Sequence, residues 1–486
     1  MVLVASNRGP VSYTLGEDGS LTARRGGGGL VSGLSALGQG AGTWVCAALG
    51  EGDRAAVARS GPRLPAADTG GQAVRMLDIP PGTFEGAYNG IANSVLWFVH
   101  HLLYQTPLEP VFDTAFEAQW SAYAAYNAAF ADALATEAEP GAAVLVQDYH
   151  LSLVPSLLRE RRPDLRIGHF SHTPWAPPDL FGVLPDAVAG EVLRGILGAD
   201  RAAFLTRRWA DAFAACCAAT LGAEVDWGSA TAAGPAGARS VTFGGRRTLL
   251  GVHGLGSDAE FLRKRAFEPD VDERLAALRE QIGARRTIVR VDRTELSKNI
   301  VRGLLAYRRL LAGHAQWRGR VVHVAFAYPS RQDLAVYRAY TAEVSRLAGE
   351  INEEFGTADW TPVVLHVKDD FARSLAAYRM ADVALVNPIR DGMNLVAKEI
   401  PVVSERGVAL VLSREAGAAE ELGADALLVN PYDLAGTAEA LHRALSMPDE
   451  ERAARSERLA AAATALPPQS WFLDQVAALD ALDRKG

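Results

Sequence analysis

The sequence predicts an α/β protein with two domains, each built around a parallel sheet covered by helices. Short apolar runs alternate with amphipathic stretches along almost the whole chain, which is typical of parallel sheets with helices on both faces. The length of 486 residues exceeds the size at which a single core usually keeps growing. Hydrophobic residues make up 49% of the chain and charged residues 22%, which is a globular composition.

In the first half, apolar runs predict buried strands at residues 2–6, 143–147, 166–171 and 202–206. Amphipathic stretches predict helices at 116–137 and 151–161. In the second half, the same patterns predict strands at 287–291, 321–327, 363–366, 383–386, 409–413 and 426–429, and helices at 331–355 and 394–402. Two further helices are predicted at 449–466 and 468–482.

A turn-rich stretch at 230–247 precedes a linker that we place near residues 251–257. We therefore predict one Rossmann-like domain at 1–250, a second at 251–466, and a terminal helix at 467–486 that packs back on the first domain. Two such domains would leave a cleft between them.

The charge balance and cysteine content exclude some classes of protein. Forty-nine basic and 57 acidic residues give a net charge of −8, which argues against a nucleic-acid partner. Three cysteines, of which two are adjacent, give no disulfide framework and fit a reducing compartment. The chain shows neither a targeting segment nor a membrane span, so we expect a cytoplasmic protein. The sequence leaves the oligomeric state open.

Polar residues recur where predicted strands end, and ligands of parallel α/β sheets bind at the carboxyl ends of the strands. Six strand ends share this feature, which predicts a polar cleft, although loops are often polar for other reasons. The residues are Asn7 and Arg8, Asp148, His172, Arg293, Ser330 and Arg331, and Arg390 and Asp391.

Two segments have the chemistry to bind a diphosphate. A run of four glycines, 26–29, precedes a predicted helix, so backbone amides and the helix dipole would face an anion, although a surface turn explains the run equally well. Arg293 and Lys298 lie on one loop after a strand and could stabilise a departing phosphate. Asp270 and Asp272 resemble a metal pair but fit an acidic helix start better, so no catalytic metal is expected.

A third segment begins at Asp391 and continues into the predicted helix 394–402. The first amides of this helix would point toward a ligand. Glu399 lies eight residues after Asp391, about 12 Å along a helix, so the two carboxylates would contact different parts of one ligand. The alternative for Glu399 is a surface residue paired with Lys398 or Arg406.

Together these segments resemble the trehalose-6-phosphate synthases, a family of glycosyltransferases with the two-domain GT-B fold. The resemblance covers nearly the whole chain and its most specific string is PIRDGMNLVAKE at 388–399. The other matching segments are 6–8, 28–30, 93–97, 148–151, Arg293, 297–298, 330–331 and 429–433.

The resemblance implies a retaining transfer of glucose from a nucleoside diphosphate to glucose 6-phosphate, giving α,α-trehalose 6-phosphate without a metal or cofactor. It implies that the first domain binds the acceptor and the second the nucleotide sugar. The implied acceptor residues are Arg8, Tyr88 and Arg331 for the phosphate, and Trp97 and Asp148 for the sugar. The implied donor residues are Gly28, Gly29, His172, Arg293, Lys298, Asp391, Gly392, Met393, Asn394, Leu395 and Glu399.

In this family the departing phosphate oxygen is thought to take the acceptor proton at the front face, so Arg293, Lys298, Asp391 and His172 would act by positioning and electrostatics. For the base, a carboxylate of Asp369 or Asp370 could accept hydrogen bonds from guanine but not from uracil, which favours GDP-glucose over UDP-glucose. The alternative is that both aspartates cap the helix that follows.

Three features depart from the family pattern: Asn299 replaces a common glycine, the strand that enters the second domain at 251–256 is less apolar than usual, and Pro401 should end or kink its helix. Two other functions share the scaffold, a pseudo-glycosyltransferase that joins cyclitols through nitrogen and a silent sugar-phosphate sensor. The intact donor string argues against the first, and the retained cationic residues argue against the second. No nicotinamide-binding motif supports a dehydrogenase.

Overall fold

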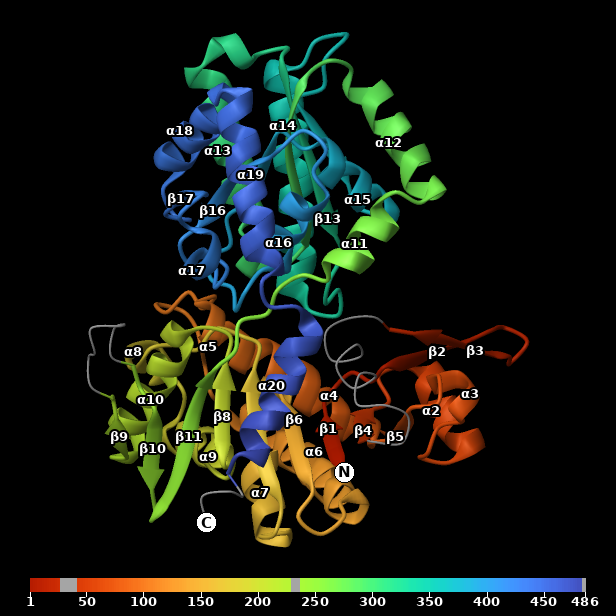
Figure 1. Cartoon of the computed structure of the whole chain (residues 1–486), viewed down its shortest axis with the longest axis vertical. Coiled ribbons are helices and arrows are strands. Elements are labelled where there is room, and N and C mark those ends of the chain that lie inside the picture. Colours follow the sequence, from red (N-terminus) through yellow and green to blue (C-terminus); the bar gives the residue numbers. More distant parts are fainter. Residues whose placement is uncertain (27–41, 229–236, 483–486) are drawn as a thin grey trace. The chain divides into compact units, whose positions relative to one another are not determined.

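The computed structural model describes residues 1–26, 42–228 and 237–482, and these form two compact units. Unit 1 contains Met1–Leu255 and Pro468–Gly486, and unit 2 contains Gly256–Pro467 (Figure 1). The sequence prediction placed the corresponding boundaries after residues 250 and 466. No helix among the described residues combines the length and the apolar character needed to cross a bilayer.

Nine of the described strands of unit 1 form one sheet, in the order β5-β4-β1-β6-β7-β8-β11-β10-β9. The strands from β5 to β11 pair in parallel, and β10 pairs antiparallel with both of its neighbours. The strands are β1 (Val2–Ala5), β4 (Gly42–Ala47), β5 (Ala73–Leu77), β6 (Ala143–Gln147), β7 (Arg166–Ser171), β8 (Arg201–Phe204), β9 (Glu224–Asp226), β10 (Ser240–Phe243) and β11 (Arg246–Val252). A separate hairpin joins β2 (Val11–Leu15) to β3 (Leu21–Arg25).

Helices connect the parallel strands of unit 1. They are α2 (Glu51–Ser60), α3 (Ala66–Thr69), α4 (Pro81–Glu85), the π-helix η1 (Gly86–Leu96), α5 (Trp97–His101), α6 (Thr114–Glu137), η2 (Tyr149–Leu151), α7 (Val154–Arg161), α8 (Pro178–Phe181), α9 (Asp186–Leu197) and α10 (Arg207–Leu221). The longest, α6, begins at an aspartate cap, because the Asp113 carboxylate accepts a hydrogen bond from the Phe116 amide.

Unit 2 is built on a parallel sheet in which six described strands follow the order β14-β13-β12-β15-β16-β17. Numbered within the unit, this is the order 3-2-1-4-5-6 of a Rossmann sheet. The strands are β12 (Arg286–Arg293), β13 (Val321–Tyr328), β14 (Val363–His366), β15 (Val383–Val386), β16 (Ala409–Ser413) and β17 (Leu427–Val429). The helices are α11 (Ala259–Ala266), α12 (Pro269–Ile282), η3 (Leu296–Lys298), α13 (Ile300–Gly313), η4 (Ala315–Trp317), α14 (Ala335–Phe355), α15 (Phe371–Met380), α16 (Leu395–Val403), α17 (Ala419–Leu422), α18 (Leu434–Ser446) and α19 (Asp449–Thr464).

The last helix, α20 (Pro468–Asp480), packs against β6 and β7 of unit 1. It buries Trp471 and Phe472, and the Trp471 ring lies edge-on to Phe170 at 4.9 Å. An ion pair of 2.5 Å joins Asp480 to Arg166. The terminal helix thus completes unit 1, although the whole of unit 2 separates it from the rest of that unit in the sequence.

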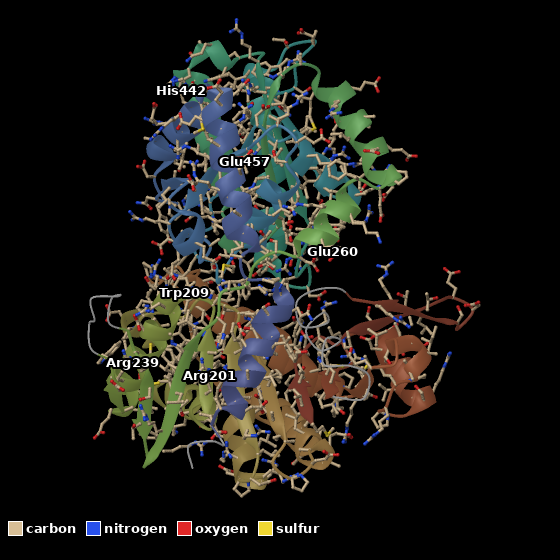
Figure 2. The ribbon with its side chains drawn as sticks, in the orientation of Figure 1. Arg201, Trp209, Arg239, Glu260, His442 and Glu457 are labelled. Atoms are coloured by element: carbon tan, nitrogen blue, oxygen red, sulfur yellow. The ribbon has the colours of Figure 1, made fainter. Side chains whose placement is uncertain are left out.

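The strand predicted at 251–256, at the entrance to the second domain, is not found there. Gly251 and Val252 end β11 of unit 1, which pairs in parallel with β8. The attachment extends to His253, whose amide donates to the Phe204 carbonyl at 2.9 Å. Its Nε2 lies 3.1 Å from the guanidinium of Arg201, the residue labelled in Figure 2. α16 contains Pro401 and ends two residues after it, at Val403.

Candidate functional site

Each unit places two of its predicted site residues at the point where the strand order of the sheet reverses. In unit 1 this point lies between β1 and β6, and Arg8 and Asp148 follow these two strands. In unit 2 it lies between β12 and β15, where Arg293 ends β12 and Asp391 follows β15. Ligands of open α/β sheets bind at such switch points, so in each unit these residues lie where the topology favours a ligand site.

Asp148 directly follows β6 in a strained backbone conformation, with a φ of 70°. Its amide donates to the Phe170 carbonyl at 2.7 Å, and its Oδ1 accepts a hydrogen bond from the His172 amide at 3.1 Å. Burial raises the pKa of the Asp148 carboxyl to about 6, although backbone amides partly offset this effect. Non-glycine residues are held at positive φ mainly where the surroundings enforce it, and often at functional sites.

His172 follows β7, so the unit places its backbone beside Asp148. Its Nε2 lies 2.9 Å from Oε1 of Gln147, and its ring packs against Phe170 and Trp471. Burial lowers the pKa of His172 to about 4, so the imidazole is neutral at physiological pH. A neutral imidazole held in this way can exchange hydrogen bonds with sugar hydroxyls, which fits the predicted donor role.

Tyr88 and Trp97 flank the segment that follows Asp148. Tyr88 lies on η1, a rare type of helix that occurs frequently at functional sites, and its ring stacks on His150 at 5.7 Å. Trp97 begins α5 and lies 5.7 Å from the Tyr149 ring. Tyr149 in turn donates to Asn93 Oδ1 at 3.0 Å. Arg8 is exposed at the end of β1, where its guanidinium is accessible to an anion.

In unit 2, Lys298 and Asp391 form an ion pair of 2.5 Å between Nζ and Oδ2. Asn394 also donates to Oδ2 of Asp391, at 3.1 Å. Burial lowers the pKa of Lys298, but the carboxylates of Asp391 and Asp292 outweigh burial and raise the pKa above its ordinary value. The lysine therefore stays charged, and the structure brings together two residues that lie 93 positions apart in the sequence.

Arg331 and Arg293 both lie within ion-pair distance of Glu295, a residue that the sequence analysis missed. The Glu295 carboxylate is fully buried and accepts hydrogen bonds from Arg331 Nη1 at 3.0 Å, from the Ser330 hydroxyl at 2.9 Å and from the Tyr337 hydroxyl at 3.2 Å. The Arg293 guanidinium lies 3.9 Å away and is 58% exposed. Arg331 adopts a φ of 47°. A single buried carboxylate thus orients the predicted acceptor arginine and borders the predicted donor arginine.

The string 391–399 leads into α16, which begins at Leu395 close to the predicted start. Asn394 caps the helix, because its side-chain oxygen accepts a hydrogen bond from the Ala397 amide at 3.1 Å. Gly392 and Met393 are buried, whereas Leu395 is exposed. Glu399 is not the surface residue of the alternative interpretation, since Lys398 pairs with Glu421 and Glu399 accepts from the Tyr378 hydroxyl at 3.3 Å. Burial raises the pKa of the Glu399 carboxyl.

Asp369 and Asp370 differ in role. Asp370 caps α15, because its Oδ1 accepts from the Arg373 amide at 3.0 Å, and its Oδ2 lies 2.9 Å from Arg274 Nε. Asp369 is exposed. The capping interpretation therefore holds for Asp370, whose carboxylate is committed to the protein, and the argument for guanine loses one of its two carboxylates.

The backbone conformation at position 299 explains why asparagine can replace the glycine that is common in the family. It adopts a left-handed φ of 60°, which glycine or asparagine tolerates best, so the substitution preserves the backbone. Its side-chain amide also donates to the carbonyls of Asn387 at 2.9 Å and Pro431 at 2.8 Å. These bonds fix the loop that carries Lys298, a function that the sequence pattern does not reveal.

Two predicted donor residues, Gly28 and Gly29, lie outside the described residues. The Asp270 and Asp272 pair occupies the first turn of α12, and each aspartate contacts an arginine, Arg265 or Arg379. This confirms the helix-start interpretation of these aspartates.

Comparison with known proteins identifies related chains over the full length described above. Residues 1–481 match the model of glycosyltransferase family 20. The chain is 35% identical over 473 residues to alpha,alpha-trehalose-phosphate synthase [UDP-forming] 2 of Aspergillus fumigatus, covering 94% of this chain and 92% of that one. It is 38% identical over 375 residues to a bifunctional trehalose-6-phosphate synthase/phosphatase of Thermoproteus tenax, where the match covers 76% of this chain and about half (48%) of that one.

Solved structures of similar chains share the fold. A trehalose-6-phosphate synthase structure from E. coli, bound with UDP-2-fluoro glucose, has a TM-score of 0.83 at 29% identity and covers 98% of both chains. An alpha,alpha-trehalose-phosphate synthase (UDP-forming) from Burkholderia vietnamiensis has a TM-score of 0.82 at 30% identity and covers 99% of both chains. These matches confirm the predicted GT-B class with two Rossmann-like parallel sheets.

Proposed function

This chain belongs to glycosyltransferase family 20, and we propose that it transfers glucose from UDP-glucose to glucose 6-phosphate, forming α,α-trehalose 6-phosphate. The observation that carries the proposal is the Lys298–Asp391 pair at the switch point of unit 2, with Arg293 on the same loop. A fixed lysine and an exposed arginine supply positive charge where a diphosphate leaving group needs it. The Asp391 carboxylate can hold a hydroxyl of the donor sugar while it keeps Lys298 in place.

We assign the acceptor to five of the residues named from the sequence. Arg8 and Tyr88 of unit 1 and Arg331 of unit 2 would bind the phosphate, since the planar guanidinium forms two-pronged contacts with phosphate oxygens. Trp97 and Asp148 would position the acceptor sugar. With a pKa near 6, Asp148 is ionised at neutral pH and can accept hydrogen bonds from sugar hydroxyls.

The proposed reaction keeps the α configuration and uses no metal. The bond between C1 of glucose and the diphosphate oxygen breaks, the acceptor oxygen attacks C1 from the same face, and its proton passes to the departing oxygen. Arg293 and Lys298 stabilise the charge on the diphosphate, and His172 and Asp391 hold the glucose hydroxyls. Gly28, Gly29 and the amides of Gly392, Met393, Asn394 and Leu395 would contact the diphosphate or the sugar, and Glu399 the ribose.

We propose UDP-glucose rather than GDP-glucose as the donor. The sequence argument for guanine needed a free carboxylate, but Asp370 caps α15 and pairs with Arg274, which leaves only the exposed Asp369. The names of the two synthases in the comparison that specify a nucleotide both give UDP as the product. The first observation weakens the argument for guanine, and the second favours uracil.

The test is to incubate the purified chain with glucose 6-phosphate and each of UDP-, GDP-, ADP-, TDP- and CDP-glucose, with and without EDTA. Nucleoside diphosphate release and the mass and linkage of the sugar product are measured. The proposal requires an α,α-1,1-linked disaccharide phosphate formed fastest from UDP-glucose and unaffected by EDTA. A GDP preference refutes the donor assignment, and absence of turnover with every donor favours a cyclitol-coupling enzyme or a sugar-phosphate sensor.

A further inference from the structure

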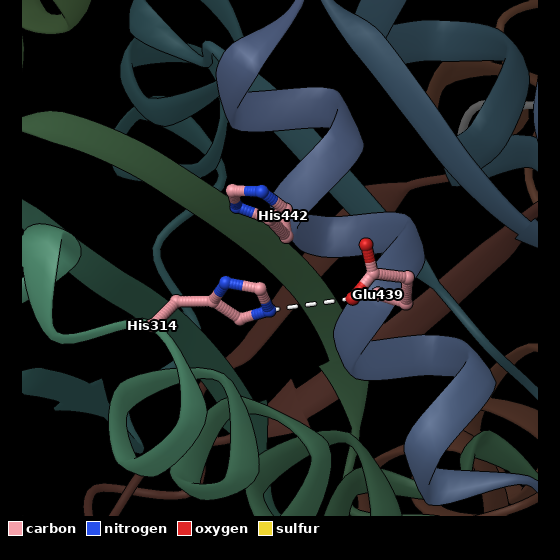
Figure 3. A group of neighbouring side chains, drawn as sticks. All are labelled: His314, Glu439 and His442. Carbon is pink, nitrogen blue, oxygen red and sulfur yellow. Dashed lines mark hydrogen bonds and ion pairs between the residues drawn. The ribbon is translucent and has the colours of Figure 1, made fainter.

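Unit 2 contains a cluster of two histidines and a glutamate that the proposed reaction does not use: His314, Glu439 and His442 (Figure 3). One potential ligand atom of each residue lies within 4.8 Å of those of the other two, and this is the one such group found among the described residues. Glu439 and His442 lie three apart on α18, so they project from the same side of that helix. His314 follows the end of α13.

We propose that these three side chains bind a divalent transition metal, with Zn²⁺ the best match. Two imidazoles and a carboxylate form the donor set of many three-ligand zinc sites, where water takes the fourth position. Nε2 of His314 and Oε2 of Glu439 are 3.3 Å apart. Two ligands about 2.0–2.1 Å from a tetrahedral ion are roughly 3.3 Å apart, so these two atoms already have a suitable separation.

The third ligand requires one ring to turn. His314 and His442 stack with their centroids 3.8 Å apart and their planes inclined by 14°. A coordinated ion lies close to the plane of each imidazole, so two nearly parallel stacked rings cannot share one ion. His314 is the better placed ring to turn, because it lies beyond the helix end and its side chain is 26% exposed, and the Glu439 side chain, 68% exposed, can follow its Nε2.

Trp317 opposes metal binding in the arrangement seen here. Its indole N–H donates to Nδ1 of His442 at 2.9 Å. If the ion binds at Nδ1, it must displace the indole. If it binds at Nε2, the neutral ring carries its proton on Nδ1, where that proton faces the indole N–H. In either case Trp317 competes with the ion, so removal of its N–H should strengthen binding.

The site is accessible from solvent. The Glu439 side chain is 68% exposed, and Glu439 and His442 line a surface cavity of about 740 Å³ beside α18, the helix on which Figure 2 labels His442. A bound ion would connect the end of α13 to α18. Because the unfolded chain lacks this preformed site, binding would stabilise unit 2 against unfolding.

The experiment uses the full chain, treated with EDTA and then freed of it, and titrated with ZnCl₂ alone by calorimetry and by thermal unfolding. We expect one ion per chain and a rise in Tm with zinc concentration. His314→Ala, His442→Ala and Glu439→Gln should each weaken binding at least about tenfold. Glu457→Gln, which removes an exposed carboxylate on α19, is the matched control and should bind as the wild type does.

Trp317→Phe provides a second, independent test, and we expect it to bind zinc more tightly than the wild type. Folding of every variant is checked by its unfolding midpoint without metal. Absence of zinc binding by the wild type, or equal binding by the double variant His314→Ala/His442→Ala, overturns the site. Weaker binding by Trp317→Phe overturns the competition argument. No readout depends on glucosyl transfer, so failure here is distinguishable from failure of the proposed function.

Discussion

Glu295 offers the sharpest test of the proposed phosphate site, because its carboxylate is buried while the residue it orients contacts substrate in our proposal. Glu295→Gln keeps the size of the side chain and one oxygen acceptor but removes the negative charge. Arg331, only 11% exposed, then loses its ion pair, and the Ser330 and Tyr337 hydroxyls lose a charged acceptor. We expect both lower stability and weaker binding of glucose 6-phosphate.

The magnitude follows from the burial of the pair. Removing one partner of a buried ion pair typically costs about 3–5 kcal/mol, and the retained amide oxygen should reduce this to about 2–3 kcal/mol. At about 2–4 °C per kcal/mol, Tm should fall by roughly 5–10 °C. If about half of the lost energy had positioned Arg331, the KM for glucose 6-phosphate should rise by about tenfold, since 1.4 kcal/mol corresponds to that factor.

The assay measures nucleoside diphosphate release while each substrate is varied separately. Arg293 lies 3.9 Å from Glu295 and is largely exposed, so the KM for the donor should change by less than about threefold. Glu353→Gln, which alters an exposed glutamate on α14, is the control and should change neither constant. Equal loss of affinity for both substrates, or an unchanged KM for glucose 6-phosphate despite a lower Tm, would refute the positioning role of Glu295.

Three further predictions concern other residues of the two units. Lys298→Ala should lower kcat by about 10²–10³-fold, because the leaving diphosphate loses a fixed charge. Lys264→Ala on α11 is the control and should leave kcat unchanged. Full activity of Lys298→Ala in steady-state turnover would contradict the site. The pKa of Asp148 is about 6 in the folded chain and has its ordinary value of 3.8 in the unfolded chain, so between these pH values only the folded chain keeps the proton. The contribution of Asp148 to stability therefore declines as the pH rises through that window. Between pH 4 and pH 7, the free energy of unfolding of Asp148→Asn, measured with urea, should therefore rise relative to that of the wild type by on the order of 2 kcal/mol. A difference between the two proteins that does not change with pH would exclude the raised pKa. Asn299→Gly removes two side-chain hydrogen bonds and should lower the free energy of unfolding by about 1–2 kcal/mol. Asn299→Ala should lower it by about 1 kcal/mol more, because alanine disfavours a positive φ. Equal stability of the two variants by denaturant titration would show that the left-handed backbone is not required.

Most of the sheet architecture was predictable because its strands are continuous apolar runs. The strands predicted at 143–147, 166–171 and 363–366 match β6, β7 and β14 residue for residue. By contrast, β4 and β5 were missed, although β4 is buried throughout. Only the last two residues of β11 fell in a predicted strand, because its sequence, RRTLLGV, mixes polar and apolar residues. Its place is decided by pairing with β8, a contact between segments far apart in the sequence.

The candidate site was predictable to the extent that its residues follow strands or fall in the specific string at 388–399. Lys298 and Asp391 were named from the sequence, but their ion pair depends on the adjacency of β12 and β15. Glu295 carried no signal, because a glutamate two residues after a strand resembles any loop residue until burial and its three donors are known. The His314 cluster was likewise hidden, since 125 residues separate His314 from Glu439.

The return of the chain to unit 1 has a consequence for synthesis and engineering. The two ends of unit 2 are tied together, because the Gly256 amide donates to the Leu466 carbonyl at 2.7 Å and the Ser257 amide to the Ala463 carbonyl at 2.8 Å. Unit 2 is therefore inserted in the sequence of unit 1, with its first and last residues hydrogen-bonded to each other. A fragment cut after residues 255 and 467 would keep these hydrogen bonds. On the ribosome, all of unit 2 is synthesised before α20, so unit 1, which begins the chain, cannot complete its fold until unit 2 has been made.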